Sequence, residues 1–396
     1  MNIKYQDPHQ HLIIIPSVSV WKNKNMLSFD RKFYDGIVLY TKEWPGMVSC
    51  IVSMSKSSCS DFGVINKTMD ELPFNCILLE NNEKITIEHL TGASIVLASA
   101  DADNQLHISA LCRNSKVKCV YVIEYIPETR YQITLLSTRN PFIILRRFVY
   151  IWQQEKKRLS AFSISDGLQS NGTPAYYEYG KFKNNLLYFD TRVYKHDCIT
   201  DVDLDVRLNG LSKNKPLNLA FSGRLIRIKG ADHLVMLALI LKQRQISYKF
   251  YIYGAGELKN EMIAYIQKHQ LESNVFMLGP VDFYNQLIPD LKKNIDLFVC
   301  LHRQSDPSCT YLETLSCGVP IVGYKNKAFS GLLSLVDIGW GAEINDLKKI
   351  ADTIEHLNEN RTQLFAKSRN AVEFARPNDF ETTFQNRINH LLSILE

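Results

Sequence analysis

Between residues 217 and 324 the sequence alternates short apolar runs with segments of helical spacing, and this alternation constrains the fold more than any other feature. We expect strands at 217–221, 248–253, 275–278, 296–301 and 319–324. Apolar residues at helical spacing lie between them, at 233–241, 258–269, 285–293 and 311–317. Apolar strands that alternate with helices are typical of a parallel sheet with helices on both faces. This part of the chain is therefore predicted to be an α/β domain.

The N-terminal half is less regular, and a second α/β domain is its simplest interpretation. Candidate strands lie at 12–15, 48–52, 76–79, 94–98, 119–124 and 162–165, and helical spacing at 31–41 and 143–158. The 396 residues exceed what one core usually holds, about 250–300 residues, so two or three domains are expected. The polar, turn-rich stretch 208–216 is the expected linker.

Composition narrows the class of protein. The nine cysteines form no CxxC pair, and their odd number and irregular spacing favour reduced core residues over a disulfide framework or a zinc site. The start of the chain lacks the character of a secretory signal, and no run approaches the ~20 apolar residues of a membrane span. The formal charge of +5 is modest, and no nucleic-acid-binding motif appears. We expect a cytoplasmic protein, soluble or peripheral at the inner face of a membrane, that does not bind nucleic acid.

The first candidate site follows the strand expected at 217–221. Gly223 allows close backbone approach, and Arg224 and Lys229 follow, five residues apart. Ligands of open α/β sheets bind beyond the carboxyl ends of the strands. A guanidinium and an ammonium group there can clamp a diphosphate and stabilise a phosphate leaving group. The alternative is a solvated basic loop.

The second candidate site is a glycine pair, Gly254 and Gly256, directly after the strand expected at 248–253. Glycines at this place permit a tight turn and bring backbone N–H groups near a ligand. A single GxG pattern is more often only a turn from strand to helix.

The third candidate site is a loop of small and hydroxyl side chains that leads into the helix expected at 311–317. Free N–H groups at the start of that helix would face an anion. Glu313, one turn into the helix, can accept hydrogen bonds from the two adjacent hydroxyls of a ribose. The alternative is a capping box between Thr310 and Glu313 that only stabilises the helix start. The candidate binding residues are Ser308, Cys309, Thr310, Tyr311 and Glu313.

Taken together, these sites resemble the nucleotide-sugar domain of the retaining GT-B glycosyltransferases, family 4 in particular. The shared pattern appears here as Gly223-Arg224, Lys229-Gly230, Gly254-Ala-Gly256, Asp296, Glu313 and Gly318-Val-Pro320. The resemblance implies two Rossmann-like domains that face each other across a cleft. These are an acceptor-side domain at 1–212 and a nucleotide-sugar-binding domain at 213–377, with the final helix, 378–396, completing the first.

The resemblance also implies roles for single residues. Arg224 and Lys229 would bind the donor phosphates in place of a metal, so neither a metal nor another cofactor is expected, and Glu313 would contact the ribose. One departure stands out, because the glutamate that the family usually has eight positions before Glu313 is Ser305 here. Its neighbour Asp306 is the candidate replacement, one residue out of register.

The N-terminal half offers one candidate catalytic residue, Glu124, at the end of the strand expected at 119–124, about where relatives place a histidine that faces the donor sugar. A carboxylate there can contact sugar hydroxyls or take the acceptor proton. It is equally consistent with a surface glutamate at a strand end. Two other stretches, 30–32 and 171–174, either line the cleft or are simply a helix start and a turn.

The segment 142–158 is apolar, aromatic and basic at helical spacing. Such a helix either lies on an anionic membrane or packs on the core with a charged end, and we favour core packing.

The sequence as a whole predicts a metal-independent, hexosyltransferase-like enzyme. It would move a sugar, with retention, from a nucleotide diphosphate donor to a glycan or lipid-linked saccharide acceptor, in cell-surface polysaccharide biosynthesis. The alternatives are a sugar-nucleotide epimerase of the same fold, which needs no acceptor, and a non-catalytic transferase-like binding subunit.

Overall fold

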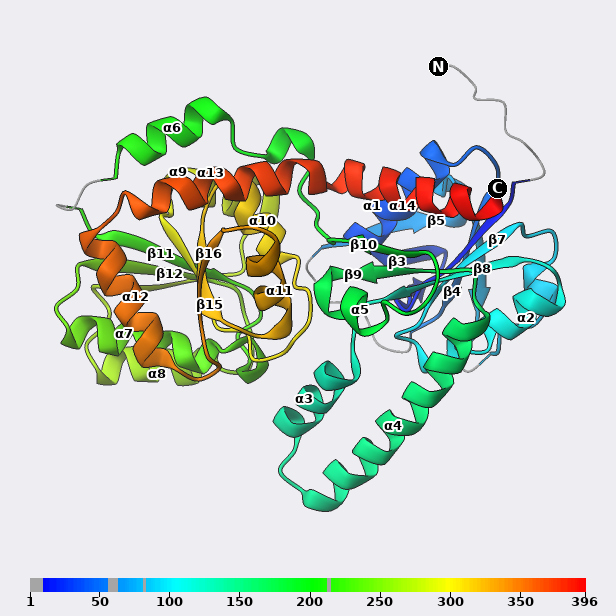
Figure 1. Cartoon of the computed structure of the whole chain (residues 1–396), viewed down its shortest axis with the longest axis horizontal. Helices are drawn as coiled ribbons and strands as arrows, with labels where there is room; N and C mark the ends of the chain where they lie inside the picture. The colour runs from blue at the N-terminus through cyan, green and yellow to red at the C-terminus, as the bar shows by residue number, and fades with distance from the viewer. Residues whose placement is uncertain (1–9, 56–62, 81–82, 212–214) are drawn as a thin grey trace.

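The computed structural model describes residues 10–55, 63–80, 83–211 and 215–396. Two parallel sheets, each flanked by helices, lie next to each other along the long axis of the molecule (Figure 1). The predicted class is confirmed: both halves are α/β domains with parallel sheets, in the GT-B arrangement. Three of the nine residues of the expected linker, 212–214, lie outside the described residues.

The N-terminal sheet has seven parallel strands in the order β10-β9-β8-β7-β1-β4-β6. Its strands are β1 (Leu12–Ile15), β4 (Val48–Ser53), β6 (Asn75–Leu79), β7 (Ile95–Ser99), β8 (Lys118–Ile123), β9 (Gly167–Asn171) and β10 (Asn185–Tyr188). A small antiparallel sheet of β2 (Trp21–Asn23), β3 (Met26–Asp30) and β5 (Val64–Thr68) is added to this domain. The helices are α1 (Arg31–Glu43), α2 (Ile108–Asn114), α3 (Pro127–Ser137), α4 (Pro141–Ile164), α5 (Gly172–Glu178) and α6 (Asp201–Asn209).

The C-terminal sheet has six parallel strands in the order β13-β12-β11-β14-β15-β16. They are β11 (Leu217–Ser222), β12 (Tyr248–Tyr253), β13 (Val275–Gly279), β14 (Leu297–Cys300), β15 (Ile321–Tyr324) and β16 (Gly339–Ala342). The helices are α7 (Ala231–Gln243), α8 (Lys259–Lys268), α9 (Ile288–Asn294), α10 (Thr310–Ser316), α11 (Lys327–Leu335), α12 (Leu347–Glu359), α13 (Gln363–Ala375) and α14 (Phe380–Leu395). Every strand and helix expected between 217 and 324 is present, with bounds that differ by a few residues.

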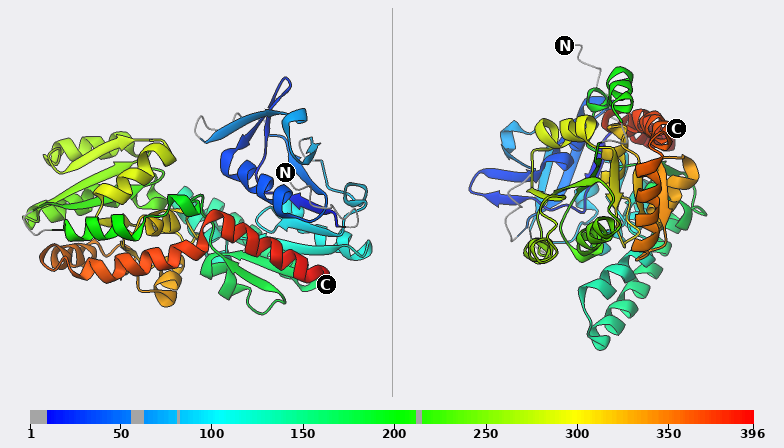
Figure 2. Two further views of the ribbon diagram at one scale, coloured as in Figure 1. Left: turned by 90° about the horizontal axis from the view of Figure 1, so that it is seen from above. Right: turned by 90° about the vertical axis from the view of Figure 1, so that its left-hand side faces the viewer.

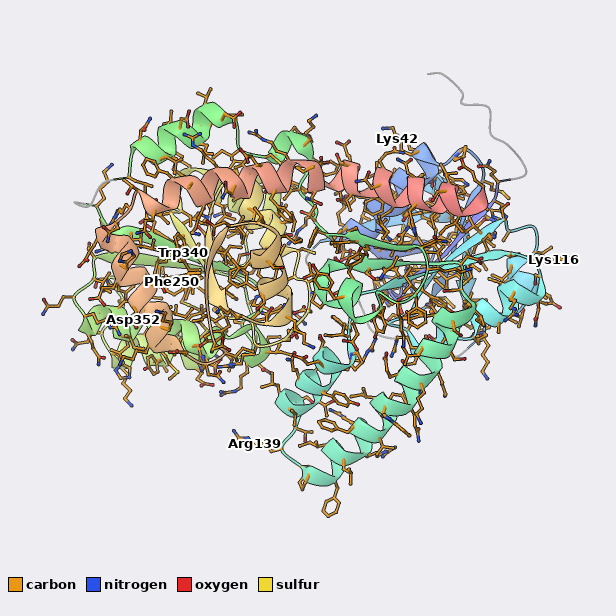
Figure 3. The ribbon with its side chains drawn as sticks, viewed as in Figure 1. Lys42, Lys116, Arg139, Phe250, Trp340 and Asp352 are labelled. Atoms are coloured by element: carbon orange, nitrogen blue, oxygen red, sulfur yellow. The ribbon has the colours of Figure 1, made fainter. Side chains whose placement is uncertain are left out.

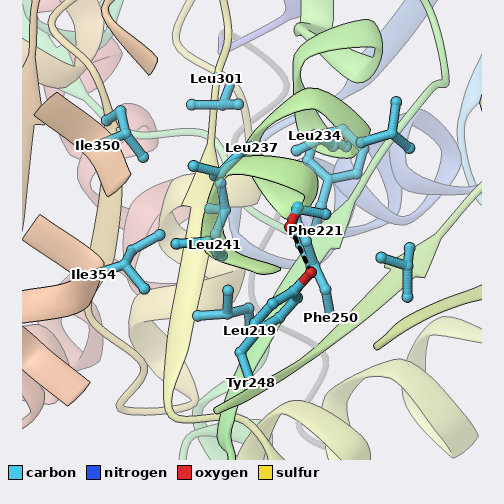
Figure 4. Packing of buried hydrophobic residues seen from close by; sticks show 14 of the residues in the cluster. Leu219, Phe221, Leu234, Leu237, Leu241, Tyr248, Phe250, Leu301, Ile350 and Ile354 are labelled. Atoms are coloured by element: carbon cyan, nitrogen blue, oxygen red, sulfur yellow. Dashed lines mark hydrogen bonds between the residues drawn. The ribbon is translucent and has the colours of Figure 1, made fainter. Parts of the chain in front are cut away.

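One face of the C-terminal sheet shows why these apolar runs form a core. Side chains of β11 and β12 pack against α7 and α12 in a single buried cluster (Figure 4). Tyr248 is buried within it, and its hydroxyl donates a hydrogen bond of 2.6 Å to the carbonyl of Ala238. The one polar group of this aromatic residue is therefore satisfied.

The prediction of a strand at 162–165 is wrong. Residues up to Ile164 continue α4, because Ile151, Arg158 and Phe162 recur at helical spacing and are all buried on one side. The helix begins with Pro141 after an Asn140 cap, and the next strand, β9, starts only at Gly167. The stretch 171–174 is not merely a turn either, because α5 starts at Gly172 directly after β9.

Helices α3 and α4 form a hairpin that projects from the body of the molecule (Figures 1 and 2). The preferred interpretation of 142–158 as a core-packing helix is wrong for residues 142–152, of which only Ile151 is buried. Phe142 is 82% exposed and Leu145 64%, and Trp152 is exposed as well. Among the described residues, no helix is long and apolar enough to cross a bilayer.

Helix α14 runs from the C-terminal domain back to the N-terminal one. Its Phe384, Ile388 and Leu391 belong to the same buried cluster as β1 and β4 of the N-terminal sheet. Helix α6 packs the other way, since Leu204 and Leu208 contact Val372 of α13 in the C-terminal half. The boundary at residue 212 stays a prediction, but α6, which precedes it, is in contact with the C-terminal domain.

The cysteines fit the expectation of reduced core residues. The eight described cysteines are free, and seven of them are buried. The exception is Cys309, which is partly exposed. Cys59 lies outside the described residues.

Candidate active site in the cleft

The glycines of the first two candidate sites hold two loops against each other. Gly223 donates a backbone hydrogen bond to Tyr253, 3.1 Å, which ties the ends of β11 and β12 together. A Cβ atom on Gly254 would lie 2.0 Å from the Gly223 carbonyl oxygen, and one on Gly256 would lie 2.5 Å from that of Leu225. Both positions require glycine for this close approach. The turn interpretation of Gly254 and Gly256 therefore has a complete physical reason, and a ligand contact there stays a prediction.

The two cations of the first site differ in their surroundings. Arg224 is exposed, and within the described part of the chain no hydrogen bond or ion pair engages its side chain. Lys229 is buried, and its ammonium lies 3.2 Å from Oδ2 of Asp306. Gly230 follows with φ +71°, and a Cβ there would lie 2.1 Å from the carbonyl oxygen of Leu301. This close contact brings the start of α7 against the end of β14.

The loop after β14 contains buried polar groups with no partner. Oδ1 of Asp306 and both ring nitrogens of His302 accept or donate no hydrogen bond to a described residue, although both side chains are buried. Burial, together with the nearby charges of Lys229 and Arg224, lowers the pKa of His302 well below its usual value, so the ring is neutral. Unpaired buried polar atoms are uncommon in proteins and are expected where a ligand binds. Sequence reasoning missed His302. Its only signal in the sequence is its position between the end of a strand and Asp306.

Glu313 of α10 is paired with an arginine from the segment between β10 and α6. The Glu313 carboxylate is buried and accepts a hydrogen bond of 2.7 Å from Nε of Arg192. The Arg192 guanidinium also lies 4.0 Å from the ring centre of Phe283. The capping box with Thr310 is not formed, because α10 starts at Thr310 without a side-chain cap. Sequence reasoning missed Arg192, 121 positions away from Glu313.

The other residues of the third candidate site have different surroundings. Tyr311 is 2% exposed, stacks on Phe329 and accepts a hydrogen bond of 3.2 Å from Asn326, so it belongs to the core. Ser308 donates a hydrogen bond of 3.2 Å to the hydroxyl of Thr310. The structure thus gives Tyr311 a packing role and leaves Ser308 and Thr310 at the start of α10.

Cys309 contacts the N-terminal domain. Its sulfur lies 2.9 Å from Nζ of Lys32, and Lys32 forms an ion pair with Asp190. Burial raises the pKa of the Cys309 thiol to about 12, so the thiol is protonated. Of the stretch 30–32, Lys32 thus reaches the cleft, whereas Asp30 caps α1 by accepting a hydrogen bond from the Phe33 amide.

Glu124 faces this cluster from the end of β8. Burial raises the pKa of its carboxyl to about 8, and the nearby carboxylates of Asp101, Asp190 and Asp306 add to the rise. Asn171, at the end of β9, donates a hydrogen bond of 3.2 Å to its Oε2. Glu124 and Asp306 come from different domains and yet influence each other across the cleft. Glu124 is not a simple surface glutamate, because its side chain is largely buried.

The domains also touch directly beside the cleft. The backbone N–H of Ser305 donates a hydrogen bond of 2.9 Å to Gln132 of α3, and the Ser305 hydroxyl contacts Glu128 of the same helix at 3.3 Å. Close to this contact, a Cβ on Gly172 would lie 2.5 Å from the ring of Pro307. Within the described ranges, no three His, Cys, Asp or Glu side chains gather as ligands for a metal ion.

The two parallel-sheet domains have the GT-B architecture. Among solved structures, HepE from Anabaena in complex with UDP is similar to this chain, with a TM-score of 0.64 and 14% identity over 97% of this chain and 99% of that one. WaaG, a glycosyltransferase involved in lipopolysaccharide biosynthesis, has a TM-score of 0.59 and 12% identity over 96% and 99% of the two chains. At these identities the likeness concerns the fold.

Sequence comparison gives a match over part of the chain. Residues 206–376 match the family described as glycosyl transferases group 1. A poly(ribitol-phosphate) alpha-N-acetylglucosaminyltransferase of Staphylococcus aureus (strain COL) is 25% identical over 138 residues, which are 35% of this chain. The match spans only 27% of that relative's length.

Proposed function

We propose that this protein is a retaining, hexosyltransferase-like glycosyltransferase that acts on a nucleotide diphosphate sugar without a metal ion. The observation that carries the proposal is the pairing of two half-sites across one cleft. The C-terminal half supplies Arg224, Lys229 and Glu313, and the N-terminal half supplies Glu124. The family of residues 206–376 supports the donor side of this assignment, and retention rests on the resemblance to family 4.

The leaving group is a nucleoside diphosphate, and its charge grows as the glycosidic bond to the donor breaks. Arg224 is exposed and unpaired, so its guanidinium is free to bind a phosphate in bidentate fashion. Lys229 shares its charge with Asp306 at 3.2 Å until a phosphate competes for it. Fixed cations at this place stabilise the departing diphosphate, which is the task a metal has in other transferases. A cation pair is thus the proposed substitute for a metal cofactor.

Glu124 is the proposed contact to the reacting hydroxyls. A carboxyl group whose pKa is about 8 exists in both protonation states near neutral pH. It can therefore hydrogen-bond a sugar hydroxyl as the acid, or accept the proton of the attacking hydroxyl as the carboxylate. Asn171 fixes its orientation through the 3.2 Å hydrogen bond.

The acceptor is proposed to be a glycan or lipid-linked saccharide, in cell-surface polysaccharide synthesis on the cytoplasmic side of a membrane. The relative from Staphylococcus aureus is, by its name, a poly(ribitol-phosphate) alpha-N-acetylglucosaminyltransferase, and WaaG is a glycosyltransferase involved in lipopolysaccharide biosynthesis. These names support the acceptor class and leave the particular acceptor to experiment.

The projecting hairpin supports contact with an anionic membrane. Figure 3 shows Arg139 at the turn between α3 and α4, and Arg146 and Arg147 are exposed on the next turns of α4. Phe142 and Leu145 are exposed among these cations. Apolar side chains that enter the interface, with cations at the headgroups, are the features of a peripheral membrane helix.

The membrane proposal is tested by co-sedimentation with vesicles of phosphatidylglycerol and of phosphatidylcholine. Phe142→Glu combined with Leu145→Glu should abolish binding to the anionic vesicles. Val202→Glu, a change at a 72% exposed apolar residue of α6, is the matched control and should bind like the wild type. Equal binding to both kinds of vesicle, or binding that survives in the double variant, would contradict it.

The transferase proposal is tested by incubating the protein with UDP-, GDP- and ADP-sugars, with and without acceptor extracts. A transferase releases nucleoside diphosphate in an acceptor-dependent way, and the anomeric configuration of the product reports retention. An epimerase converts the nucleotide sugar without acceptor, and a binding subunit consumes none. Either of these two outcomes would reject the proposal.

A further inference from the structure

A cavity of 240 Å³ lies in the N-terminal domain, at the carboxyl ends of β1 and β7. Helices α1 and α14 close it, and most of its wall is apolar, with side chains such as Ile15, Ile37 and Phe384. Its volume lies just below the usual range for small-molecule pockets, about 300–1,000 Å³, and suits one sugar or polyol unit of a larger ligand. Lys32 and Asp190, which connect to Cys309 and the donor side, form part of its rim. The cavity therefore opens toward the site where transfer is proposed.

Arg387 of α14 places a buried positive charge in this cavity. The residue is only 8% exposed, and its guanidinium lies between the rings of Tyr188, Phe384 and Tyr40, at 4.4, 5.0 and 5.7 Å. Nε donates a hydrogen bond of 2.8 Å to Gln169. The guanidinium also interacts with the Tyr40 hydroxyl, and within the part of the chain that the structure describes Arg387 has no ion pair.

The other charges of the cavity neutralise Arg387 only in part. The Asp190 carboxylate acts on Arg387 electrostatically but forms its ion pair with Lys32. Asp30 is turned to the backbone, where it caps α1. A buried guanidinium without a carboxylate is unfavourable unless a ligand brings the missing anion. The aromatic rings hold the plane of the guanidinium, and no carboxylate of the described residues forms an ion pair with its N–H donors, so an anion can engage them.

We propose that this cavity binds an anionic group of the acceptor, a carboxylate or a phosphate on a sugar or polyol unit, through Arg387. The apolar wall contacts the carbon skeleton of the unit, and the rim at Asp190 directs the neighbouring hydroxyl toward Glu124. The inference rests on the proposed transferase function, because it gives that function its acceptor class. An acidic or phosphorylated glycan is thus expected to be a substrate and a neutral glycan a poor one.

Binding is measured by saturation-transfer NMR with three probes: glucuronate, glucose 6-phosphate and glucose. The protein carries Arg224→Ala, so that the donor-phosphate site does not contribute. At least one of the two anions should bind at least tenfold more tightly than glucose, and Arg387→Gln should remove that preference. Which anion binds tells a carboxylate-bearing acceptor from a phosphate-bearing one. Equal binding of all three probes, or a preference that survives in Arg387→Gln, overturns the proposal.

A purely structural role of Arg387 is separated by two further variants. Gln169→Ala removes the side-chain hydrogen bonds of Gln169 that tie α14 to β9 but keeps the guanidinium, so the anion preference should persist. Arg387→Lys keeps the charge but loses the planar fork, and it should retain a weaker preference. If Arg387→Gln does not fold, the proposal is still tested by the wild type and by Arg387→Lys. An anion preference in Arg387→Lys that equals that of the wild type contradicts bidentate recognition by the guanidinium. Because no probe is turned over, these results stand even if no donor sugar is consumed.

Discussion

Glu124→Gln tests the electrostatics of the cleft without knowledge of the substrates. The change keeps the size of the side chain and the acceptor for the Asn171 amide, and it removes the proton equilibrium. In the folded protein the carboxyl has a pKa of about 8, against 4.5 for the free group. Between pH 4.5 and pH 8, the Glu124 carboxyl therefore holds a proton in the folded protein that it has lost in the unfolded chain.

The sign of the pH dependence follows from this difference. Because the folded state binds more protons, the free energy of unfolding of the wild type falls as pH rises from about 4.5 to about 8, and then levels off. Each pKa unit corresponds to ~1.4 kcal/mol, so the full effect is about 5 kcal/mol at most, less whatever water entering the cleft restores. The free energy of unfolding of Glu124→Gln does not fall in this way, because the glutamine side chain has no such proton to lose. The variant should match the wild type near pH 4.5 and be more stable by several kcal/mol at pH 8.

The measurement is chemical denaturation of both proteins at pH 5, 6, 7 and 8. Glu272→Gln, a change of an exposed carboxylate with no ion pair among the described residues, is the control and should follow the wild type at each pH. A stability difference between Glu124→Gln and the wild type that stays within ~0.5 kcal/mol from pH 5 to pH 8 would refute the argument. It would mean that Glu124 is hydrated and not held by its carboxylate neighbours.

Three further predictions concern the donor side. Arg224→Ala should lower kcat/KM for the donor by about 10- to 100-fold, from a lost charge-assisted contact of ~1.5–3 kcal/mol, with an unchanged melting temperature; wild-type kinetics would refute the donor-site assignment. Glu313→Gln should mainly raise the donor KM, and a fall in kcat alone would point to a chemical role of Glu313. Arg192→Ala should lower the melting temperature, because it leaves the buried carboxylate of Glu313 unpaired. Asp306→Asn should lower kcat strongly and leave donor KM equal or lower, since Lys229 is then free for the phosphate; turnover within twofold of the wild type, with donor binding unchanged, would rule out a chemical role.

Local pattern was enough to predict most strands of the two parallel sheets, but β9, β10 and β16 were missed. Strand β9 shows the reason most clearly. Its neighbours in the sheet are apolar runs, whereas β9 reads Gly-Leu-Gln-Ser-Asn and is buried along its whole length. The burial is possible because Gln169 bonds to Arg387, Ser170 to Asn185, and Asn171 to Glu124. Two of these three partners are 47 or more positions away, so no window of the sequence signals the strand. The same tertiary contacts hold Glu124 and Arg387 in place.

The candidate site was predictable where backbone geometry is imposed by residue type. Gly223 and Gly254 each follow the end of a strand, and Arg224 and Lys229 come after Gly223. The strand pattern of the sequence therefore places these residues at the carboxyl edge of the sheet. Pairings between distant segments were not predictable. Arg192 with Glu313, and Lys32 with Cys309, join residues 121 and 277 positions apart.

The contacts of Ser305 give a physical reason for the departure from the family pattern. A glutamate at this position would have to face the donor sugar, but Ser305 is 1% exposed and faces α3, where Gln132 and Glu128 bond to it. A carboxylate here would meet Glu128 at close range and repel it. The next residue, Asp306, pairs with Lys229 and adds to the rise that burial, Asp101 and Asp190 give to the pKa of Glu124. The shift of one residue therefore follows from the use of position 305 for contact between the domains, which leaves the negative charge of the donor loop to position 306.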